Sequence, residues 1–117
     1  MRISTVLNLT WVKSTNDSWL PLLRVNLEGV KTEGVYAMWQ GNGPYVRVGQ
    51  GDVAARLIAH RNDPAITRYG NLYVTWAAVS KSQRDGVERY LYDECSPLVG
   101  ERAPDVPAIA VNLPGKS

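Results

Sequence analysis

The chain has 117 residues, a length that favours one domain with a single hydrophobic core and requires neither disulfides nor a structural metal for stability. Hydrophobic residues make up 44% and charged residues 21% of the sequence, a balance that excludes an intrinsically disordered chain. The 13 basic and 11 acidic residues leave a formal net charge of +2, so any site for a polyanion must be a local patch.

Residues 1–33 show the weakest pattern of the chain. Residues 6–12 partly alternate and are β-branched, so they could form a strand. The apolar run 19–27 contains Pro21, which argues against a continuous helix there. We interpret residues 1–33 as an N-terminal extension packed on a domain formed by residues 34–117, acting either as a flap or docking segment or as an integral layer.

Two features of the sequence bear on its cellular location. Polar side chains interrupt residues 3–9 too often for the hydrophobic region of a signal peptide, and no apolar run approaches the roughly 18 residues of a membrane span. The single cysteine, Cys95, excludes an internal disulfide and fits a reducing compartment. We therefore expect a soluble cytoplasmic protein without a membrane partner.

A β-hairpin is the clearest local prediction. The strand-like runs 35–39 and 45–48 flank residues 41–44, Gly-Asn-Gly-Pro, which are typical of a turn. A two-residue turn at the start of that segment would place Tyr36 directly opposite Arg47. A slip of one residue would separate these two side chains onto different faces of the sheet.

A helix is expected directly after the hairpin. Asp52 is a plausible N-cap, and the helix should run from Val53 to about residue 61 or 62, where an Asp-Pro pair ends it. Polar residues at a spacing of four form a ridge beside the apolar stripe, and these are Asp52, Arg56 and His60. The residues expected to form the buried stripe are Val53, Ala54, Leu57 and Ile58.

A third strand and a second long helix complete the pattern. Residues 72–79 are aromatic and β-branched without polar alternation, which predicts the central, most buried strand. A helix should begin near Ser82 and stop before Pro97, with Glu88 on its polar side. The tail offers at most a short strand near residues 108–112. The order predicts an α+β fold, a small three-stranded and mainly antiparallel sheet flanked by helices.

An ordered set of residues resembles the motifs of the GIY-YIG nuclease superfamily. Gly34-Val35-Tyr36 and Arg47-Val48-Gly49 stand where that family has its two tripeptides. Arg56 and His60 match its Arg-x-x-x-His on the first helix, and Glu88 with the downstream Pro97 matches its Glu and proline. The resemblance covers roughly residues 33–100, with strand, strand, helix, strand and helix between the motifs.

The resemblance implies metal-dependent cleavage of a DNA phosphodiester. By position, Tyr36 would help to activate water, Arg56 would stabilise phosphate charge, and Glu88 would hold Mg²⁺ or Mn²⁺, with Arg47 and His60 completing the catalytic set. Phosphodiester hydrolysis needs a positioned nucleophile, a cationic group facing the developing charge and a metal ion at the phosphate. A single protein carboxylate can suffice for Mg²⁺, because this ion keeps several waters and shares phosphate ligands.

One departure from the family pattern matters for function. The second tripeptide has Arg47 where the family has tyrosine, and arginine stays protonated and accepts no proton. A guanidinium near Tyr36 would favour its phenolate and could hold phosphate, which helps catalysis. Equally, it could mark a catalytically decayed module that binds nucleic acid or a protein partner without cleavage, since losing one proton-transfer group typically costs about 10²–10⁴ in rate.

These residues also have purely structural alternatives. Tyr36 could be a half-buried strand tyrosine, and Arg56 a solvated arginine that pairs with Asp52. Glu88 could be a surface charge paired with Arg84 or Tyr92. His60 has no second histidine with which to share a zinc site.

Aromatic and basic residues outside the motifs also have both a structural and a functional interpretation. The tryptophans fit a core, although an exposed Trp39 at the hairpin tip could stack on a base. Arg61, Arg68 and Lys81 could form a patch that faces phosphate, or they could be ordinary solvated charges.

Overall fold

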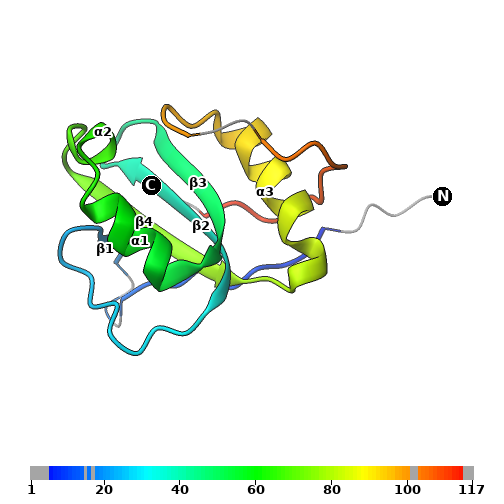
Figure 1. Ribbon diagram of the computed structural model, residues 1–117, viewed down its shortest axis with the longest axis horizontal. Helices are drawn as coiled ribbons and strands as arrows, with labels where there is room; N and C mark the ends of the chain where they lie inside the picture. Colours follow the sequence, from blue (N-terminus) through cyan, green and yellow to red (C-terminus); the bar gives the residue numbers. More distant parts are fainter. Residues whose placement is uncertain (1–5, 15, 17, 101–102, 115–117) are drawn as a thin grey trace.

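The structure is a computed structural model that describes residues 6–14, 16, 18–100 and 103–114. Within these residues the chain forms a sheet with helices on its flanks, which confirms the predicted α+β class (Figure 1). The elements, in chain order, are β1 (Leu20–Pro21), β2 (Glu33–Gln40), β3 (Tyr45–Asp52), α1 (Val53–Arg61), α2 (Pro64–Thr67), β4 (Leu72–Ala78) and α3 (Lys81–Cys95).

The sheet is antiparallel and has the strand order β1-β4-β2-β3. The three predicted strands are present, and the two-residue β1 adds a fourth beside β4. Both β4 and β2 are inner strands, so residues 72–79 lie inside the sheet as predicted, but β2, which pairs along its length with β3 and β4, is the more buried of the two. Both runs are apolar, and periodicity does not distinguish a central strand from one whose outer edge a short segment covers.

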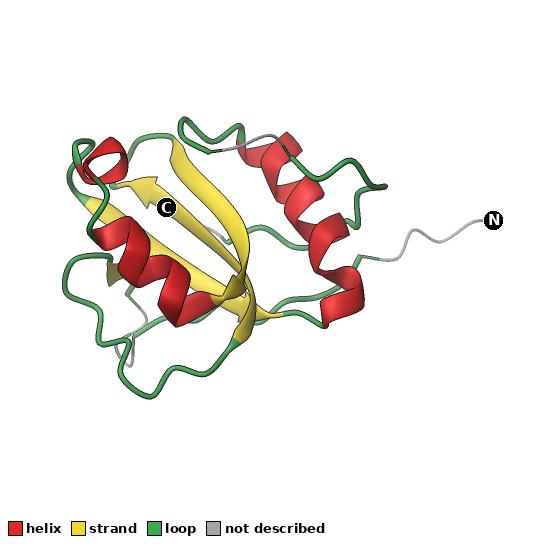
Figure 2. Cartoon of the chain, viewed as in Figure 1, coloured by secondary structure: helices red, strands yellow, loops and turns green. Residues whose placement is uncertain are grey.

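The two longer helices lie on opposite faces of the sheet (Figure 2). Side chains alternate along β2, so Tyr36 and Met38 share one core cluster with Leu57 of α1. On the other face, Ala37 belongs to a second cluster with Leu91 of α3. Helix α3 lies toward the β3 edge of the sheet, which brings its polar side close to that edge.

The β2–β3 hairpin has a different register from the predicted one. Tyr36 pairs with Gly49, and Arg47 pairs with Met38. The ladder is irregular just after Met38, and residues 41–44 all belong to the connection, so the two-residue turn was wrong. Because the register differs from the prediction by two residues, Arg47 still lies on the same face as Tyr36, diagonal to it.

Helix α1 begins and ends as predicted. The Asp52 carboxylate accepts a hydrogen bond from the Ala55 N–H at 3.3 Å, and the helix ends at Arg61. Its buried stripe is narrower than predicted, because Leu57 is buried whereas Ile58 is 47% exposed. An apolar residue at the margin of a helix stripe can face either the core or water, and spacing alone does not decide which.

Two further helices differ from the sequence-based reading in detail. The short α2 was not predicted, since one helical turn has too few residues for a period to be recognised. Helix α3 begins at Lys81, one residue before the predicted start, and ends at Cys95 ahead of Pro97, as expected.

The N-terminal segment contributes to the core. Leu22 and Leu27 are buried in the cluster that includes α1, so this part of the segment is an integral layer. The possible strands at residues 6–12 and 108–112 are absent as strands, and only an isolated bridge joins Leu7 to Val111. Among the described residues, no helix has the length and apolar character needed to cross a bilayer.

Candidate functional site

Tyr36 and His60 make the closest polar contact of the site. Tyr36 projects from β2 toward α1, is only 1% exposed, and places its hydroxyl 2.6 Å from His60 Nε2. Gly49 lies opposite Tyr36, and a Cβ at that position would collide with the tyrosine ring and hydroxyl. The glycine of the second tripeptide is therefore required for the close approach of this ring to β3.

The protonation states of this pair follow from burial and nearby charge. Burial, assisted by the positive charge of Arg47, lowers the pKa of His60 to about 4, so the ring is neutral at pH 7. Burial raises the pKa of Tyr36, and the charge and hydrogen bonding of Arg47 oppose this shift without reversing it. Because arginine only donates, the Tyr36 oxygen accepts from Arg47 and its proton is directed to His60 Nε2.

Arg47 is partly buried and incompletely satisfied. Its Nε atom is buried and has no hydrogen-bond partner within the described part of the chain. The segment after α3 crosses the β3 edge here, with the Val99 N–H donating to the Val46 carbonyl at 2.8 Å. A Cβ on Gly100 would lie 3.0 Å from Arg47 Nη1, so this segment passes directly against the guanidinium. A buried donor without an acceptor is costly, which marks this point as a candidate anion site.

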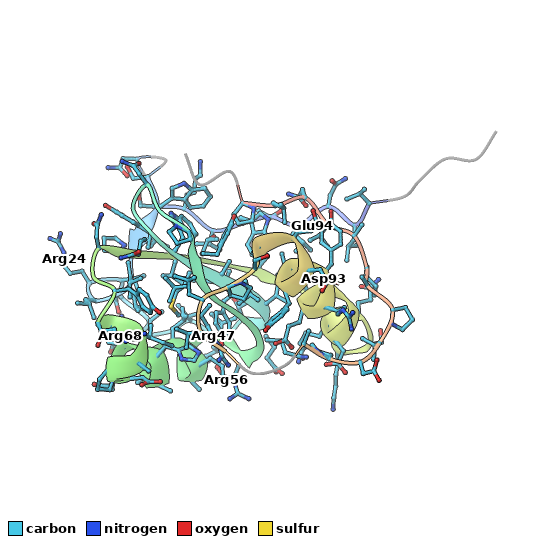
Figure 3. The ribbon with its side chains drawn as sticks, turned by 90° about the horizontal axis from the view of Figure 1, so that it is seen from above. Arg24, Arg47, Arg56, Arg68, Asp93 and Glu94 are labelled. Carbon is cyan, nitrogen blue, oxygen red and sulfur yellow. The ribbon has the colours of Figure 1, made fainter. Side chains whose placement is uncertain are left out.

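Arg56 lies on the same side of the molecule as Arg47 (Figure 3). It is an exposed residue of α1, and its side chain folds back over β3, because a Cβ on Gly51 would lie 3.4 Å from Arg56 Nε. Its charge acts on the pKa values of Tyr36, His60 and Glu88. The two arginines therefore act on one common set of titratable groups.

Glu88 reaches this set from the opposite face of the sheet. It projects from α3 at the β3 edge, where Gln50 Nε2 of β3 donates to Glu88 Oε1 at 2.9 Å and also to Asp85. Burial raises the pKa of Glu88, while the hydrogen bond from Gln50 and the charge of Arg47 oppose the shift. The negative charge of Glu88 in turn raises the pKa of Tyr36. Although α1 and α3 cover different faces of the sheet, Glu88 is near enough for its charge to act on the Tyr36 hydroxyl.

The structure thus brings together all the site residues named from the sequence. We call them the edge cluster, and they are Tyr36, Arg47, Arg56, His60 and Glu88. Sequence reasoning missed Gln50, which holds Glu88 and Asp85 together. The available signal was the spacing of those two carboxylates, which at i and i+3 share one face of a helix.

Other candidates from the sequence lie outside the edge cluster. Arg61 donates to the Leu22 carbonyl at 2.8 Å and to the Val25 carbonyl at 2.8 Å, so its role is structural. It is therefore not part of a patch that faces phosphate. Trp39 is 1% exposed, which excludes stacking on a base at the hairpin tip. Arg68 lies against the ring of Tyr69, its guanidinium carbon 4.9 Å from the ring centroid.

Comparisons with protein-family models, with curated proteins and with solved structures gave no match.

Glu88 of the edge cluster and the neighbouring Asp85 carry carboxylates, a ligand type that suits a hard divalent cation. No group of three or more His, Cys, Asp or Glu side chains capable of holding a metal occurs among the described residues. Mg²⁺ is commonly held by one or two carboxylates together with water and substrate phosphate. Glu88, with Asp85 one turn before it, provides such oxygen donors at a fixed position next to two arginines.

Proposed function

We propose that this chain is a GIY-YIG-like, metal-dependent endonuclease that hydrolyses phosphodiesters of nucleic acid, with DNA as the expected substrate. The supporting observation is the edge cluster itself, in which side chains from β2, β3, α1 and α3 influence one another's pKa values. Its combination of cationic donors, a tyrosine–histidine pair and a carboxylate is what hydrolysis of a phosphodiester requires. A cytoplasmic location, consistent with the lone cysteine, belongs to the same proposal.

The two arginines would bind the scissile phosphate. Arg47 has a buried donor that lacks a partner among the described residues, and an anionic oxygen would satisfy it. Arg56 is exposed and would meet the same phosphate from α1. Preorganised donors of this kind stabilise the charge that develops on the phosphate oxygens in the transition state.

Tyr36 and His60 would accept and relay the proton of the attacking water. As the water oxygen bonds to phosphorus, the bond from phosphorus to the leaving oxygen breaks, and that oxygen takes a proton from solvent. The water proton passes to the Tyr36 oxygen, and the tyrosine's own proton passes to His60 Nε2 across the 2.6 Å contact. His60 is suited to receive it because its ring is neutral at pH 7. Arg47 stabilises negative charge on the tyrosine oxygen during this transfer.

Glu88 would hold the divalent cation, with Gln50 fixing its carboxylate. When bound, such a cation supplies charge neutralisation at the phosphate oxygens and the leaving group.

The test is nicking of supercoiled plasmid in the presence of Mg²⁺ or Mn²⁺. We expect Glu88→Gln and Arg56→Ala each to lower the rate by about 10²-fold or more. The matched controls are Glu94→Gln on the exposed end of α3 and Arg68→Ala beside α2, which should cut at the wild-type rate. Equal activity in the wild type and both site variants would refute the proposal.

A specific observation favours a second candidate, a module that binds nucleic acid or a protein without cleavage. Tyr36 is 1% exposed, so water has little access to its oxygen for a proton transfer. Arg47 cannot replace the missing tyrosine as a proton acceptor. Fluorescence anisotropy of labelled DNA in the presence of EDTA distinguishes the candidates. Metal-independent binding that Arg56→Ala weakens, together with no nicking in Mg²⁺ or Mn²⁺, would support this version.

A further inference from the structure

A concave site lies at the other edge of the sheet, where the N-terminal segment runs along β4. It is an open surface pocket of about 590 Å³, within the size range of small-molecule sites. The site is separate from the edge cluster, because none of its lining residues belongs to that cluster. We call it the Trp19 pocket, and its lining residues are Ser14, Asn16, Ser18, Trp19, Leu20, Pro21, Arg24 and Tyr73.

The aromatic walls of the Trp19 pocket are held from behind by the core. Trp19 meets Trp39 edge-on, with ring centroids 5.2 Å apart and planes at 90°. Trp39 in turn stacks on Tyr73 at 6.4 Å and 26°. Because Trp39 is buried, it fixes the orientation of both rings that line the pocket. Such rings form a rigid platform for a flat ligand, which loses little side-chain freedom on binding.

Positive charge accompanies these rings. Arg24 is exposed and lines the pocket, and Figure 3 shows it at the end of the molecule far from the acidic Asp93 and Glu94 of α3. Lys13 Nζ lies 4.4 Å from the centroid of the Trp19 ring. The side chains of Ser14, Asn16 and Ser18 make the rim polar, with Ser14 and Asn16 hydrogen-bonded to each other and to the Ser18 N–H. A ligand that matches this pocket is flat, carries polar atoms at its edge, and is negatively charged.

We propose that the Trp19 pocket binds a nucleotide, with the base against Trp19 and Tyr73 and the phosphate paired with Arg24. Stacking on aromatic side chains is the common way in which proteins hold unpaired bases, and arginine is suited to phosphate. A neutral sugar or an aromatic peptide side chain would use the rings but not the charge of Arg24. The inference does not depend on cleavage at the edge cluster, and the nucleotide can be free or part of a single strand.

The test follows the four tryptophan indole signals in ¹H–¹⁵N NMR spectra while ligand is added to the full chain. The probes are AMP, adenosine, ribose 5-phosphate and a five-nucleotide oligodeoxyadenylate. We expect AMP to shift the Trp19 signal and to bind more tightly than adenosine or ribose 5-phosphate, each of which lacks half of the recognised chemistry. Equal affinity for AMP and the oligonucleotide would support a single nucleotide as the ligand unit, whereas much tighter oligonucleotide binding would support a strand as its source.

Charge reversal at Arg24 sharpens the test. Arg24→Glu should weaken AMP binding about tenfold without affecting folding, because the side chain is exposed. Arg68→Glu is the matched control at another exposed arginine and should leave the affinity unchanged. An unmoved Trp19 signal, adenosine binding as tightly as AMP, or equal loss in both arginine variants would overturn the proposal. A Trp19→Leu variant is not used, because it would also disturb the packing of Trp19 against Trp39.

Discussion

Arg47 and Arg61 are both partly buried, but the surrounding chain satisfies their donors differently. Arg61, at the end of α1, donates from Nε and Nη2 to the Leu22 carbonyl and from Nη2 to the Val25 carbonyl. Arg47, on β3, has a buried Nε without a partner among the described residues and lies among other titratable groups. Arg61 ties the N-terminal segment to α1, whereas Arg47 Nε keeps a donor that none of the described residues uses.

This difference separates a structural arginine from a candidate functional one. A buried donor that is satisfied by backbone carbonyls contributes to stability, because removing it also leaves those carbonyls without a hydrogen-bond donor. A buried donor that remains unsatisfied lowers stability and is retained where another requirement outweighs that cost. Substitution should therefore affect stability at Arg61 and function at Arg47.

The largest expected effect is the loss of DNA cleavage when Arg47 is replaced. Replacing Arg47 by methionine keeps much of the side-chain volume and removes the donors proposed to bind phosphate. We expect the rate of plasmid nicking to fall by about 10²–10³-fold, as for loss of a single transition-state donor. The melting temperature should stay the same or rise, because an incompletely paired buried charge is removed. A marked loss of thermal stability would place Arg47 in the same structural class as Arg61.

The reciprocal change is Arg61→Met, which should act on stability alone. It leaves the buried carbonyls of Leu22 and Val25 without the donors that Arg61 provides, so we expect a loss of about 2–3 kcal/mol in the free energy of unfolding. Urea denaturation followed by tryptophan fluorescence measures this loss. Nicking activity per folded molecule should equal that of the wild type. If Arg61→Met instead abolished nicking while remaining fully stable, the distinction between the two arginines would fail.

Local signals in the sequence were sufficient for the elements that carry the edge cluster. The turn residues 41–44, the N-cap Asp52 and the stop at Pro64 are each read from neighbouring residues, and the hairpin and α1 lie where they predict. Tyr36 and Arg47 also share a face as expected. Their pairing was predicted wrongly, because the irregular ladder near the end of β2 depends on how both faces of the sheet pack.

Features that depend on tertiary packing could not be predicted. The role of Gln50 requires α3 to lie along the β3 edge, and no local pattern states which edge a helix follows. The burial of Leu22 depends on the N-terminal segment covering β4, although that segment shows no clear period. The exposure of Ile58 on α1 also depends on tertiary packing, and its spacing along the helix did not predict it. Arg61 was a candidate phosphate ligand in the sequence because the carbonyls that satisfy its donors, those of Leu22 and Val25, are distant in sequence and cannot be recognised from it.

Gln50 offers a smaller effect that tests whether the edge cluster is organised for function. Gln50→Leu removes the hydrogen bond to Glu88, so the pKa of Glu88 should rise further and its carboxylate should lose its fixed position. We expect the Mg²⁺ concentration for half-maximal nicking to rise by about 10–100-fold, as for loss of a residue that orients a metal ligand. The control is Gln40→Leu, which removes a glutamine bonded to the Tyr69 carbonyl outside the cluster. Identical metal dependence in wild type and Gln50→Leu would show that Gln50 does not position Glu88.

The smallest expected effect concerns His60 and pH. The folded protein keeps this histidine neutral down to a pKa of about 4, whereas the unfolded chain protonates it near 6.5. Between these values the unfolded chain binds more protons, so stability is fully present above pH 6.5 and falls as the pH drops toward 4. From pH 7 to pH 5 the wild type should lose about 1–2 kcal/mol relative to His60→Gln, measured by urea denaturation.

Because His60 is the single histidine, its imidazole signals in ¹H NMR spectra report this titration without ambiguity. A folded-state pKa near 6.5 would mean that the ring is solvated and does not hold the Tyr36 proton. A value near 4 that rises in Arg47→Met would instead show that the charge of Arg47 reaches the tyrosine–histidine pair, as burial beside a guanidinium requires. The comparison with Arg61→Met completes the argument, because Arg61 is not among the groups that shift this pKa and its removal should leave the value unchanged.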